Sequence, residues 1–201
     1  MAPSQSKVAK VATLCSGIES FIIAVENLCA KNQRLVLDHV ASCEKDPKVI
    51  KVIKRNFKPR RFYKDTADCV NDSFPFHTLL GAGPPCQPYA GQGQHLGMAD
   101  CRSQPLIDVL CVISLKKPYA FIIEEVENFT RGKHTAEFAE VIVELERIGV
   151  EHGNKRFVFK NQIRVKLGGI MNQPGLWQVG GVSEGSGNVK GLADLRSNHC
   201  L

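Results

Sequence analysis

Apolar runs alternate with amphipathic stretches along residues 8–149 of this chain. Short apolar runs bounded by turn residues are typical of buried strands, whereas apolar residues spaced by three and four are typical of helices packed on a sheet. A strand, a helix and a second strand form a parallel unit, because the chain must cross the sheet to return in the same direction. The pattern therefore predicts an α/β fold, with a doubly wound, mostly parallel sheet covered by helices.

The order of the expected elements supports this interpretation. Strands are predicted at residues 8–15, 34–43, 60–65, 75–83 and 118–126, and helices at residues 19–30, 46–57, 103–117 and 135–149. Beyond residue 149 the alternation ends, although 156–160 and 162–166 are candidate short strands. Residues 168–191 are rich in glycine and are predicted to be a loop or disordered. We place a domain boundary near residue 150, with a divergent or poorly ordered tail over 151–201.

The composition limits the size and the partners of the protein. With 201 residues, 43% of them hydrophobic, the chain is long enough to bury one substantial core. Its formal net charge of +6 is compatible with an anionic partner such as nucleic acid, without the excess of a histone-like tail.

The cysteines indicate a reducing environment. Eight cysteines are scattered at positions 15, 29, 43, 69, 86, 101, 111 and 200, with no C-x-x-C pair. This spacing is neither that of a secreted disulfide framework nor that of a zinc site, so no metal is expected. No signal peptide or membrane span is visible. We therefore expect an intracellular protein, in the nucleus if the source is eukaryotic and in the cytoplasm if it is bacterial.

Residues 81–93 read GAGPPCQPYAGQG and hold a single cysteine, Cys86, behind two prolines. The prolines fix the backbone ahead of Cys86, and the loop follows a predicted strand, where open α/β sheets carry their sites. Gly81 and Gly83 are expected to let a ligand approach the backbone. A thiol held in this way is a candidate nucleophile where neighbouring groups favour its thiolate form.

The longer segment GPPCQPYAGQGQHLGMADCR, residues 83–102, resembles the catalytic loop of the cytosine-5 DNA methyltransferases. The family pattern runs G-P-P-C-Q, an aromatic residue, a small residue, spaced glycines and D-x-R. This chain matches that pattern at Cys86, Gln87, Tyr89, Ala90, Gly93, Gly97, Asp100 and Arg102. The resemblance covers about residues 10–130 and implies a Rossmann-like methyltransferase fold that binds S-adenosyl-L-methionine.

The resemblance assigns the cofactor to the ends of the first strands. TLCSGIES (13–20) is similar to the family's turn that cradles S-adenosylmethionine, and Gly17 permits such a tight turn. Glu44 stands where doubly wound folds grip ribose hydroxyls. Asp65, with Asp68 as a rival, matches the acid that meets the adenine amine. The predicted cofactor-binding residues are Cys15, Ser16, Gly17, Ile18, Glu19, Glu44, Asp65, Gly83 and Pro85.

The segment FIIEEVENF (121–129) is similar to the family's strand that ends in E-N-V, with Glu124 as the acid that contacts the target cytosine. Glu125 stands in place of the family's asparagine, and a second carboxylate beside the first is able to repel it or raise its pKa. QIRVK (162–166) resembles the family's Q-x-R-x-R element. The predicted catalytic residues are Cys86, Glu124, Arg102 and Arg164.

These assignments imply a mechanism. Cys86 attacks carbon 6 of a cytosine that is flipped out of the DNA helix, because a stacked base hides both of its faces. Glu124 holds or protonates ring nitrogen 3, and carbon 5 takes the methyl group from S-adenosylmethionine. Loss of the carbon 5 proton then releases Cys86.

Two other interpretations stay open. A related transferase that modifies cytosine in tRNA shares the same loop, although this chain lacks the C-F-T tripeptide often found in that branch. A catalytically inactive remnant that binds cofactor or partners is the second, because of Glu125 and the glycine-rich tail. Family members usually continue into a target-recognition region and a last helix, so the chain looks truncated or divergent there. A protein partner is then one source of target recognition.

Overall fold

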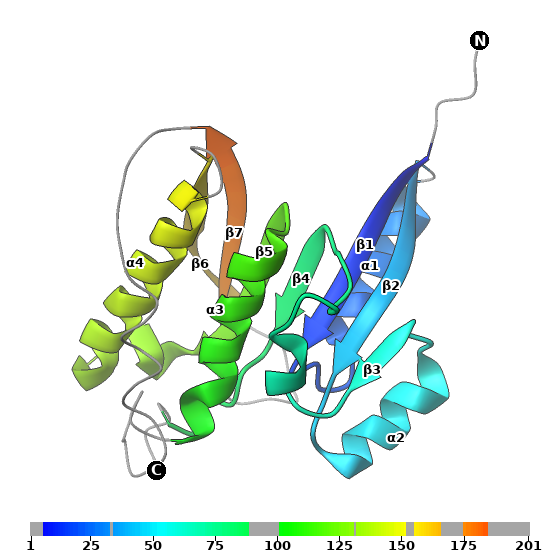
Figure 1. Ribbon diagram of the computed structural model, residues 1–201, viewed down its shortest axis with the longest axis horizontal. Helices are drawn as coiled ribbons and strands as arrows, with labels where there is room; N and C mark the ends of the chain where they lie inside the picture. The colour runs from blue at the N-terminus through cyan, green and yellow to red at the C-terminus, as the bar shows by residue number, and fades with distance from the viewer. Residues whose placement is uncertain are drawn as a thin grey trace.

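The computed structural model describes residues 6–32, 34–88, 101–130, 132–151, 155–165 and 175–184, which form a seven-stranded sheet with helices on both faces (Figure 1). The strands are β1 (Lys7–Leu14), β2 (Leu35–Cys43), β3 (Arg61–Tyr63), β4 (Leu79–Ala82), β5 (Ala120–Val126), β6 (Lys155–Val165) and β7 (Gly175–Glu184). The helices are α1 (Ser20–Lys31), α2 (Pro47–Asn56), α3 (Gln104–Lys116) and α4 (Thr135–Glu151). None of the helices in these ranges combines the length and the apolar character needed to cross a bilayer.

The strand order is β3-β2-β1-β4-β5-β7-β6. The pairs from β3 to β5 are parallel, whereas β7 runs antiparallel to both β5 and β6. The predicted α/β class with a doubly wound, mostly parallel sheet is therefore confirmed.

The direction of winding reverses between β1 and β4. The chain moves outward from β1 to β2 and β3, and then returns to add β4 on the other side of β1. In doubly wound sheets, the carboxyl ends of the strands form a crevice at such a reversal. The register brings Leu14 at the end of β1 beside Ala82 at the end of β4, so both strands end at this point.

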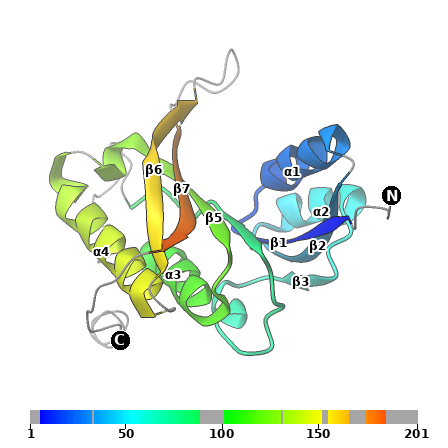
Figure 2. The same ribbon diagram turned by 90° about the horizontal axis from the view of Figure 1, so that it is seen from above.

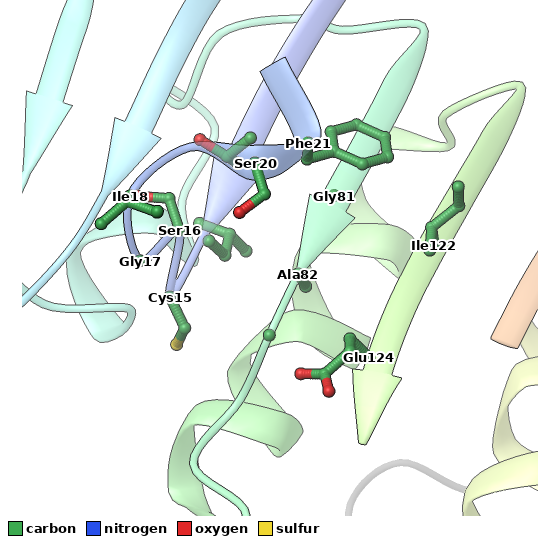
Figure 3. A pocket seen from close by; sticks show the side chains of 13 residues that line it. Cys15, Ser16, Gly17, Ile18, Ser20, Phe21, Gly81, Ala82, Ile122 and Glu124 are labelled. Atoms are coloured by element: carbon green, nitrogen blue, oxygen red, sulfur yellow. The ribbon is translucent and has the colours of Figure 1, made fainter. Parts of the chain in front are cut away.

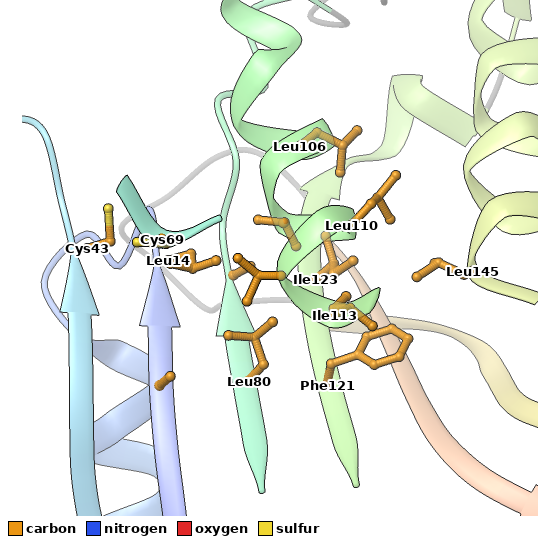
Figure 4. Packing of buried hydrophobic residues seen from close by; sticks show 14 of the residues in the cluster. Leu14, Cys43, Cys69, Leu80, Leu106, Leu110, Ile113, Phe121, Ile123 and Leu145 are labelled. Atoms are coloured by element: carbon orange, nitrogen blue, oxygen red, sulfur yellow. The ribbon is translucent and has the colours of Figure 1, made fainter. Parts of the chain in front are cut away.

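The face of the sheet that carries α3 and α4 holds the larger apolar cluster. Leu80, Phe121 and Ile123 project from the strands toward the helices, where they pack with Leu110 and Leu145 (Figure 4). Burial of one such side chain is worth about 1.5–3 kcal/mol. This cluster therefore fixes β4 and β5, the two strands that lead into the predicted catalytic residues.

The opposite face is covered by α1 and α2, as Figure 2 shows. Its buried cluster is small and consists of Val11 from β1 with Ile22 and Val25 from α1. The helix α2 begins as its sequence predicts: Pro47 occupies the first turn, and the Asp46 carboxylate accepts hydrogen bonds from the Lys48 and Val49 amides at 2.7 and 3.4 Å.

The C-terminal strands differ from the prediction. A single strand, β6, with an irregularity between Lys160 and Ile163, takes the place of two short strands. The prediction of a loop was wrong for residues 175–184, which form β7. Hydrogen bonding to β5 on one side and β6 on the other gives this glycine-rich backbone partners that its own sequence does not reveal. A domain boundary near residue 150 stays a prediction, although β6 and β7 join the same sheet.

Candidate active site

A cavity of about 440 Å³ opens at the reversal point of the sheet (Figure 3). Its walls come from three places: the end of β1 with the following turn and the start of α1, the end of β4, and the end of β5. The lining comprises residues 13–18, 20–21, 81–83, 122 and 124. The cavity thus lies where a doubly wound sheet is expected to bind a ligand.

The turn between β1 and α1 has an unusual backbone. Cys15, Gly17 and Glu19 all have positive φ angles, of 50°, 53° and 63°. An added Cβ at Gly17 would meet nothing within 4 Å, so glycine serves there for its backbone freedom and not for space. For Cys15 and Glu19 the left-handed conformation is strained, at a cost of the order of 1–3 kcal/mol each. Other contacts must therefore hold the turn in place.

Glu44 is one of these contacts. It follows β2, and its Oε2 accepts a hydrogen bond from the Gly17 amide at 2.9 Å. Its Oε1 accepts from the amides of Lys45 and Asp46 at 2.8 and 2.9 Å. The Ser16 amide also donates to the Cys43 carbonyl, at 3.1 Å. The end of β2 therefore supports the turn from the side, with Glu44 as its main acceptor.

The cavity wall includes two polar side chains from the turn. The Ser16 hydroxyl oxygen is buried and has no hydrogen-bond partner among the described residues. The Cys15 thiol points away from the turn, past the carboxyl ends of the strands (Figure 3), and burial raises its pKa far above the usual thiol range. At neutral pH Cys15 is therefore a neutral wall residue, and Ser16 has hydrogen-bonding capacity left for a ligand.

Glu19 lies behind the turn and not on the cavity wall. It has no exposed surface, and its side chain makes no capping hydrogen bond to α1. Its Oε1 instead accepts a hydrogen bond from the Thr13 hydroxyl at 3.0 Å. Burial raises the pKa of this carboxyl, and the hydroxyls of Ser42 and Thr13, as hydrogen-bond donors, oppose that rise.

Glu124 and Glu125 at the end of β5 face opposite sides of the sheet. Side chains alternate along a strand, and Glu124 points into the cavity (Figure 3) while Glu125 continues the buried row of Phe121 and Ile123. Burial raises the pKa of both carboxyls, and the negative charge of Glu124 adds to the rise at Glu125. Glu125 is 3% exposed, and neither of its carboxylate oxygens has a hydrogen-bond partner in the described part of the chain.

Cys86 follows β4 after Gly83 and the two prolines, and it is partly exposed. Its pKa is raised, first by burial and then by the charges of Glu125 and Glu124, while its own backbone opposes the rise. The thiol therefore lies within electrostatic reach of both β5 carboxyls. It is not part of the cavity wall, whose β4 portion ends at Gly83.

The remaining predicted residues do not line the cavity. Asp65 is exposed, and its Oδ1 accepts a hydrogen bond from the Ala67 amide at 3.0 Å. Pro85 is partly exposed beside Cys86, and Arg102 is exposed in the short helix η3 (Cys101–Ser103). Arg164 lies in β6. Tyr89, Ala90, Gly93, Gly97 and Asp100 of the catalytic-loop pattern lie outside the described residues.

Several residues of the cavity wall were not among the predicted site residues, and two of them are instructive. Phe21 was interpreted only as part of the apolar face of α1, yet its ring lines the cavity and packs on Gly81. An added Cβ at Gly81 would lie only 2.4 Å from Phe21 Cδ1. Gly81 therefore accommodates an aromatic ring, where a ligand was expected to approach the backbone. Ile122, the second missed residue, looks in sequence like any core residue of a strand.

Comparison with known proteins gives the class of this site. Residues 9–156, well over half of the chain, match the family of C-5 cytosine-specific DNA methylases. The chain belongs to this family.

Two curated relatives illustrate the extent of the match. Type II methyltransferase M.NgoBV of Neisseria gonorrhoeae is 32% identical over 119 residues, which cover 59% of this chain and 28% of that protein. Type II methyltransferase M.HaeII of Haemophilus aegyptius is 30% identical over 140 residues, which cover 70% of this chain and 42% of that protein. The chain therefore spans less than half the length of these relatives.

Solved structures share the fold. The Dnmt2 methyltransferase of S. pombe superposes with a TM-score of 0.58 at 21% identity, covering 91% of this chain and 52% of that one. The methyltransferase EhMeth of Entamoeba histolytica gives a TM-score of 0.61 at 16% identity, with 92% and 56% covered.

Proposed function

We propose that this protein transfers a methyl group from S-adenosyl-L-methionine to carbon 5 of cytosine in DNA, through a transient bond between Cys86 and the base. The observation that carries the proposal is the shared edge of two neighbouring parallel strands: Cys86 follows β4, and Glu124 lines the cavity at the end of β5. A nucleophile and an acid at one edge suit covalent catalysis. Membership of the family supports cytosine carbon 5 as the acceptor.

The cavity fits S-adenosylmethionine in size and in chemistry. Its volume of about 440 Å³ lies within the ~300–1,000 Å³ usual for small-molecule sites. The buried Ser16 hydroxyl lacks a partner among the described residues, and a polar ligand would satisfy it. When bound, S-adenosylmethionine supplies a methyl group made electrophilic by a positively charged sulfur.

We infer that the turn of residues 15–18 holds the amino-acid end of this cofactor and that Glu44 holds the ribose. Backbone amides occupy three of the roughly four acceptor positions of the Glu44 carboxylate, which leaves room for one hydroxyl donor. Gly83 and Pro85 would pass beneath the methyl-bearing end, and Asp65 is the candidate for the adenine amine.

The chemical step depends on Cys86 and Glu124. With a flipped cytosine in place, the Cys86 sulfur would form a bond to carbon 6 while Glu124 holds or protonates ring nitrogen 3. The raised pKa of Glu124 keeps a proton available for this role nearer to neutral pH than an ordinary carboxyl would. After carbon 5 has been methylated, loss of its proton to water and cleavage of the carbon–sulfur bond release Cys86.

The thiolate of Cys86 is the attacking form, and its raised pKa makes that form less available while the neighbouring carboxyls are negatively charged. Burial and the two β5 carboxyls disfavour its thiolate, so protonation of either carboxyl lowers the barrier to forming it. A positive charge near the base or its phosphate acts in the same direction. Arg102 and Arg164 are the candidates for that charge.

Covalent trapping tests the proposal directly. A DNA duplex with 5-fluorocytosine should form a stable adduct in the presence of S-adenosylmethionine, because fluorine cannot leave as a proton does. We expect the adduct to be absent in Cys86→Ser and retained in the control Cys29→Ser, which changes a partly exposed cysteine of α1. Measurable S-adenosylmethionine binding without any adduct would contradict methyl transfer and favour the inactive alternative.

The same assay separates DNA from RNA. A tRNA with 5-fluorocytosine should form less adduct than the DNA duplex, in line with the DNA methylase family. The reverse preference would favour the tRNA alternative. A protein partner for target recognition and a nuclear or cytoplasmic location stay predictions of the sequence.

A further inference from the structure

A cluster of buried polar side chains lies on the α1 face of the sheet, directly behind the turn that lines the cavity. It consists of Thr13 at the end of β1, His39 and Ser42 in β2, and Glu19 at the start of α1. Thr13, Ser42 and Glu19 are at most 1% exposed. These four polar groups lie on the face of the sheet that holds the smaller apolar cluster. Burying polar groups costs free energy unless hydrogen bonds offset it, so their presence calls for an explanation.

Strands β1 and β2 place polar side chains around the Glu19 carboxyl. Thr13 and Ser42 are direct partners in the β1–β2 register, so their side chains lie next to each other on one face. The irregularity between Val11 and Ala12 sets this alignment. Thr13 Oγ1 donates to Glu19 Oε1 at 3.0 Å, and Ser42 Oγ lies 2.8 Å from His39 Nε2.

The imidazole of His39 also lies beside the Glu19 carboxyl, and it carries no charge there near pH 7. His39 Nε2 lies 3.9 Å from Glu19 Oε1. Burial lowers the pKa of His39 to about 4, so the ring is neutral near pH 7 and the contact is not an ion pair. The Glu19 carboxyl is therefore held by neutral hydrogen-bond donors: Ser42 lies beside it, and Thr13 donates to its Oε1 at 3.0 Å.

The position of Glu19 in the chain shows what this contact does. An acid just before a helix usually caps it by accepting from the first-turn amides, but the Glu19 side chain makes no such bond and turns toward the sheet. Its backbone is left-handed, and its amide closes the turn onto the Ser16 carbonyl at 3.0 Å. Holding the side chain therefore also holds a strained backbone, whose preceding residues, 15–18, form part of the cavity wall.

We propose that Glu19 is a positioning residue for cofactor binding. Its carboxyl, hydrogen-bonded to Thr13 in the buried cluster, keeps the β1–α1 turn in the left-handed conformation that shapes the cavity. The inference rests on the proposed function, because it assigns the cavity to S-adenosylmethionine. Glu19 does not touch the ligand, since its side chain is fully buried and outside the lining. Glu19 sets the fraction of molecules in which the turn has the conformation that binds the cofactor. If that fraction falls, the apparent affinity falls in proportion.

Affinity for S-adenosylhomocysteine, measured by calorimetry, tests the proposal. Glu19→Ala should weaken binding about tenfold, as expected for loss of a buried hydrogen bond that leaves its partner unsatisfied. Glu19→Gln keeps an acceptor oxygen for Thr13 and should bind within about twofold of the wild type. Equal affinities of Glu19→Ala and the wild type, or equal weakening in Glu19→Ala and Glu19→Gln, would overturn the proposal.

A double-mutant cycle and a matched control identify the contact. If Thr13 acts through Glu19, Thr13→Val should weaken binding in the wild type but add nothing in the Glu19→Ala background. Additive losses would contradict the coupling. Thr78→Val is the control: Thr78 also bonds through its hydroxyl to β1, at the Lys10 backbone, but does not line the cavity, and its loss should leave the affinity unchanged.

Hydrogen exchange of the protein without ligand separates this inference from the proposed function. In the wild type the Gly17 amide is bonded to Glu44 and should be protected. Faster exchange at Gly17 in Glu19→Ala, but not in Glu19→Gln, is expected whether or not S-adenosylhomocysteine binds. Absence of binding by the wild type would count against the proposed function, whereas unchanged exchange in Glu19→Ala would count against the role of Glu19.

Discussion

Two buried glutamates lie on either side of the cavity and differ in what surrounds them. Glu19, behind the turn, accepts a hydrogen bond from Thr13 and lies close to a neutral His39. Glu125, at the end of β5, has another carboxyl as its neighbour in the chain, and neither of its oxygens has a hydrogen-bond partner in the described part of the chain.

The difference shows how one residue type serves two purposes. A buried carboxyl that accepts a hydrogen bond is able to hold the backbone in place, because that bond offsets part of the free-energy cost of burying it. A carboxyl without partners is sensitive to protonation, because only the neutral form is well tolerated in its surroundings. We therefore infer that the turn side of the cavity serves fixed geometry, and that protonation on the β5 side changes the charge near the Cys86 thiol.

The largest effect is expected on the β5 side. Glu124→Gln should reduce methyl transfer to DNA by at least about a hundredfold, as is usual for loss of a general acid. Its affinity for S-adenosylhomocysteine should change little, because the amide keeps the size of the carboxyl. Single-turnover methylation and calorimetry measure the two quantities. Loss of affinity without loss of the single-turnover rate would move Glu124 from catalysis to the cofactor wall.

The next effect is expected where the two sides meet, at Gly81 and Phe21. Gly81→Ala places a Cβ 2.4 Å from Phe21 Cδ1, so the ring must move, and we expect a loss of about 2 kcal/mol in the free energy of unfolding. Denaturant titration measures this loss. Adding Phe21→Leu should recover part of it.

Gly83→Ala is the matched comparison for stability. Its Cβ would lie 3.4 Å from the Cys15 carbonyl oxygen and 3.6 Å from Glu124 Oε2, at the edge of ordinary contact. A loss equal to that of Gly81→Ala would show that the Phe21 ring is not the cause.

A smaller effect is expected at Glu44 on the turn side. Glu44→Ala removes the acceptor of three backbone amides, including that of Gly17, and should weaken S-adenosylhomocysteine binding about tenfold. Asp46→Ala removes a helix cap two residues away, so it should reduce stability by about 1 kcal/mol without weakening binding. Equal affinity losses in both variants would indicate a general loosening of the β2–α2 connection.

The smallest effect separates the two buried glutamates by pH. The folded state holds the proton of Glu125 above the ordinary pKa of 4.5, so the unfolded state releases it first as pH rises. The free energy of unfolding should therefore fall from about pH 4.5 upward, until the folded state also ionises. Glu125→Gln should flatten this fall by an amount on the order of 1 kcal/mol.

Glu19→Gln should change the same profile in the same direction but by less, because the hydroxyls of Ser42 and Thr13 favour the ionised form of Glu19. Denaturant titration between pH 4 and 8 measures both variants. Glu146→Gln, which changes an exposed residue of α4, is the control. A steeper fall in Glu125→Gln than in the wild type would contradict the raised pKa of Glu125.

Local patterns predicted most of the strands and helices up to residue 151. Apolar periodicity located α1, α3 and β5 to within one or two residues, because each buries a face that its own sequence marks. The Asp46-Pro47 start of α2 was equally local. The strand β7 could not be predicted in this way, because its glycines carry no apolar pattern and its hydrogen-bond partners come from β5 and β6.

The candidate site likewise has one part that the sequence predicted and another that only the structure showed. Its chemical groups, Cys86, Glu124 and the turn around Gly17, stand out in the sequence through motifs whose residue types suit nucleophilic attack, proton transfer and a tight turn. The packing of Phe21 on Gly81 required the structure, because it depends on which segments share a face. The opposite facing of Glu124 and Glu125 follows from the alternation of a strand, but the structure was needed to show which of the two lines the cavity.

The sequence by itself determined the fold class and the residues able to do chemistry, since periodicity and side-chain type are properties of short segments. The tertiary structure alone decided that Glu19 supports the turn from behind, and that Glu125 is buried near the thiol without a partner among the described residues. The physical reason is that burial and hydrogen bonding, which set the protonation and the role of a carboxyl, are supplied by residues far away in the chain.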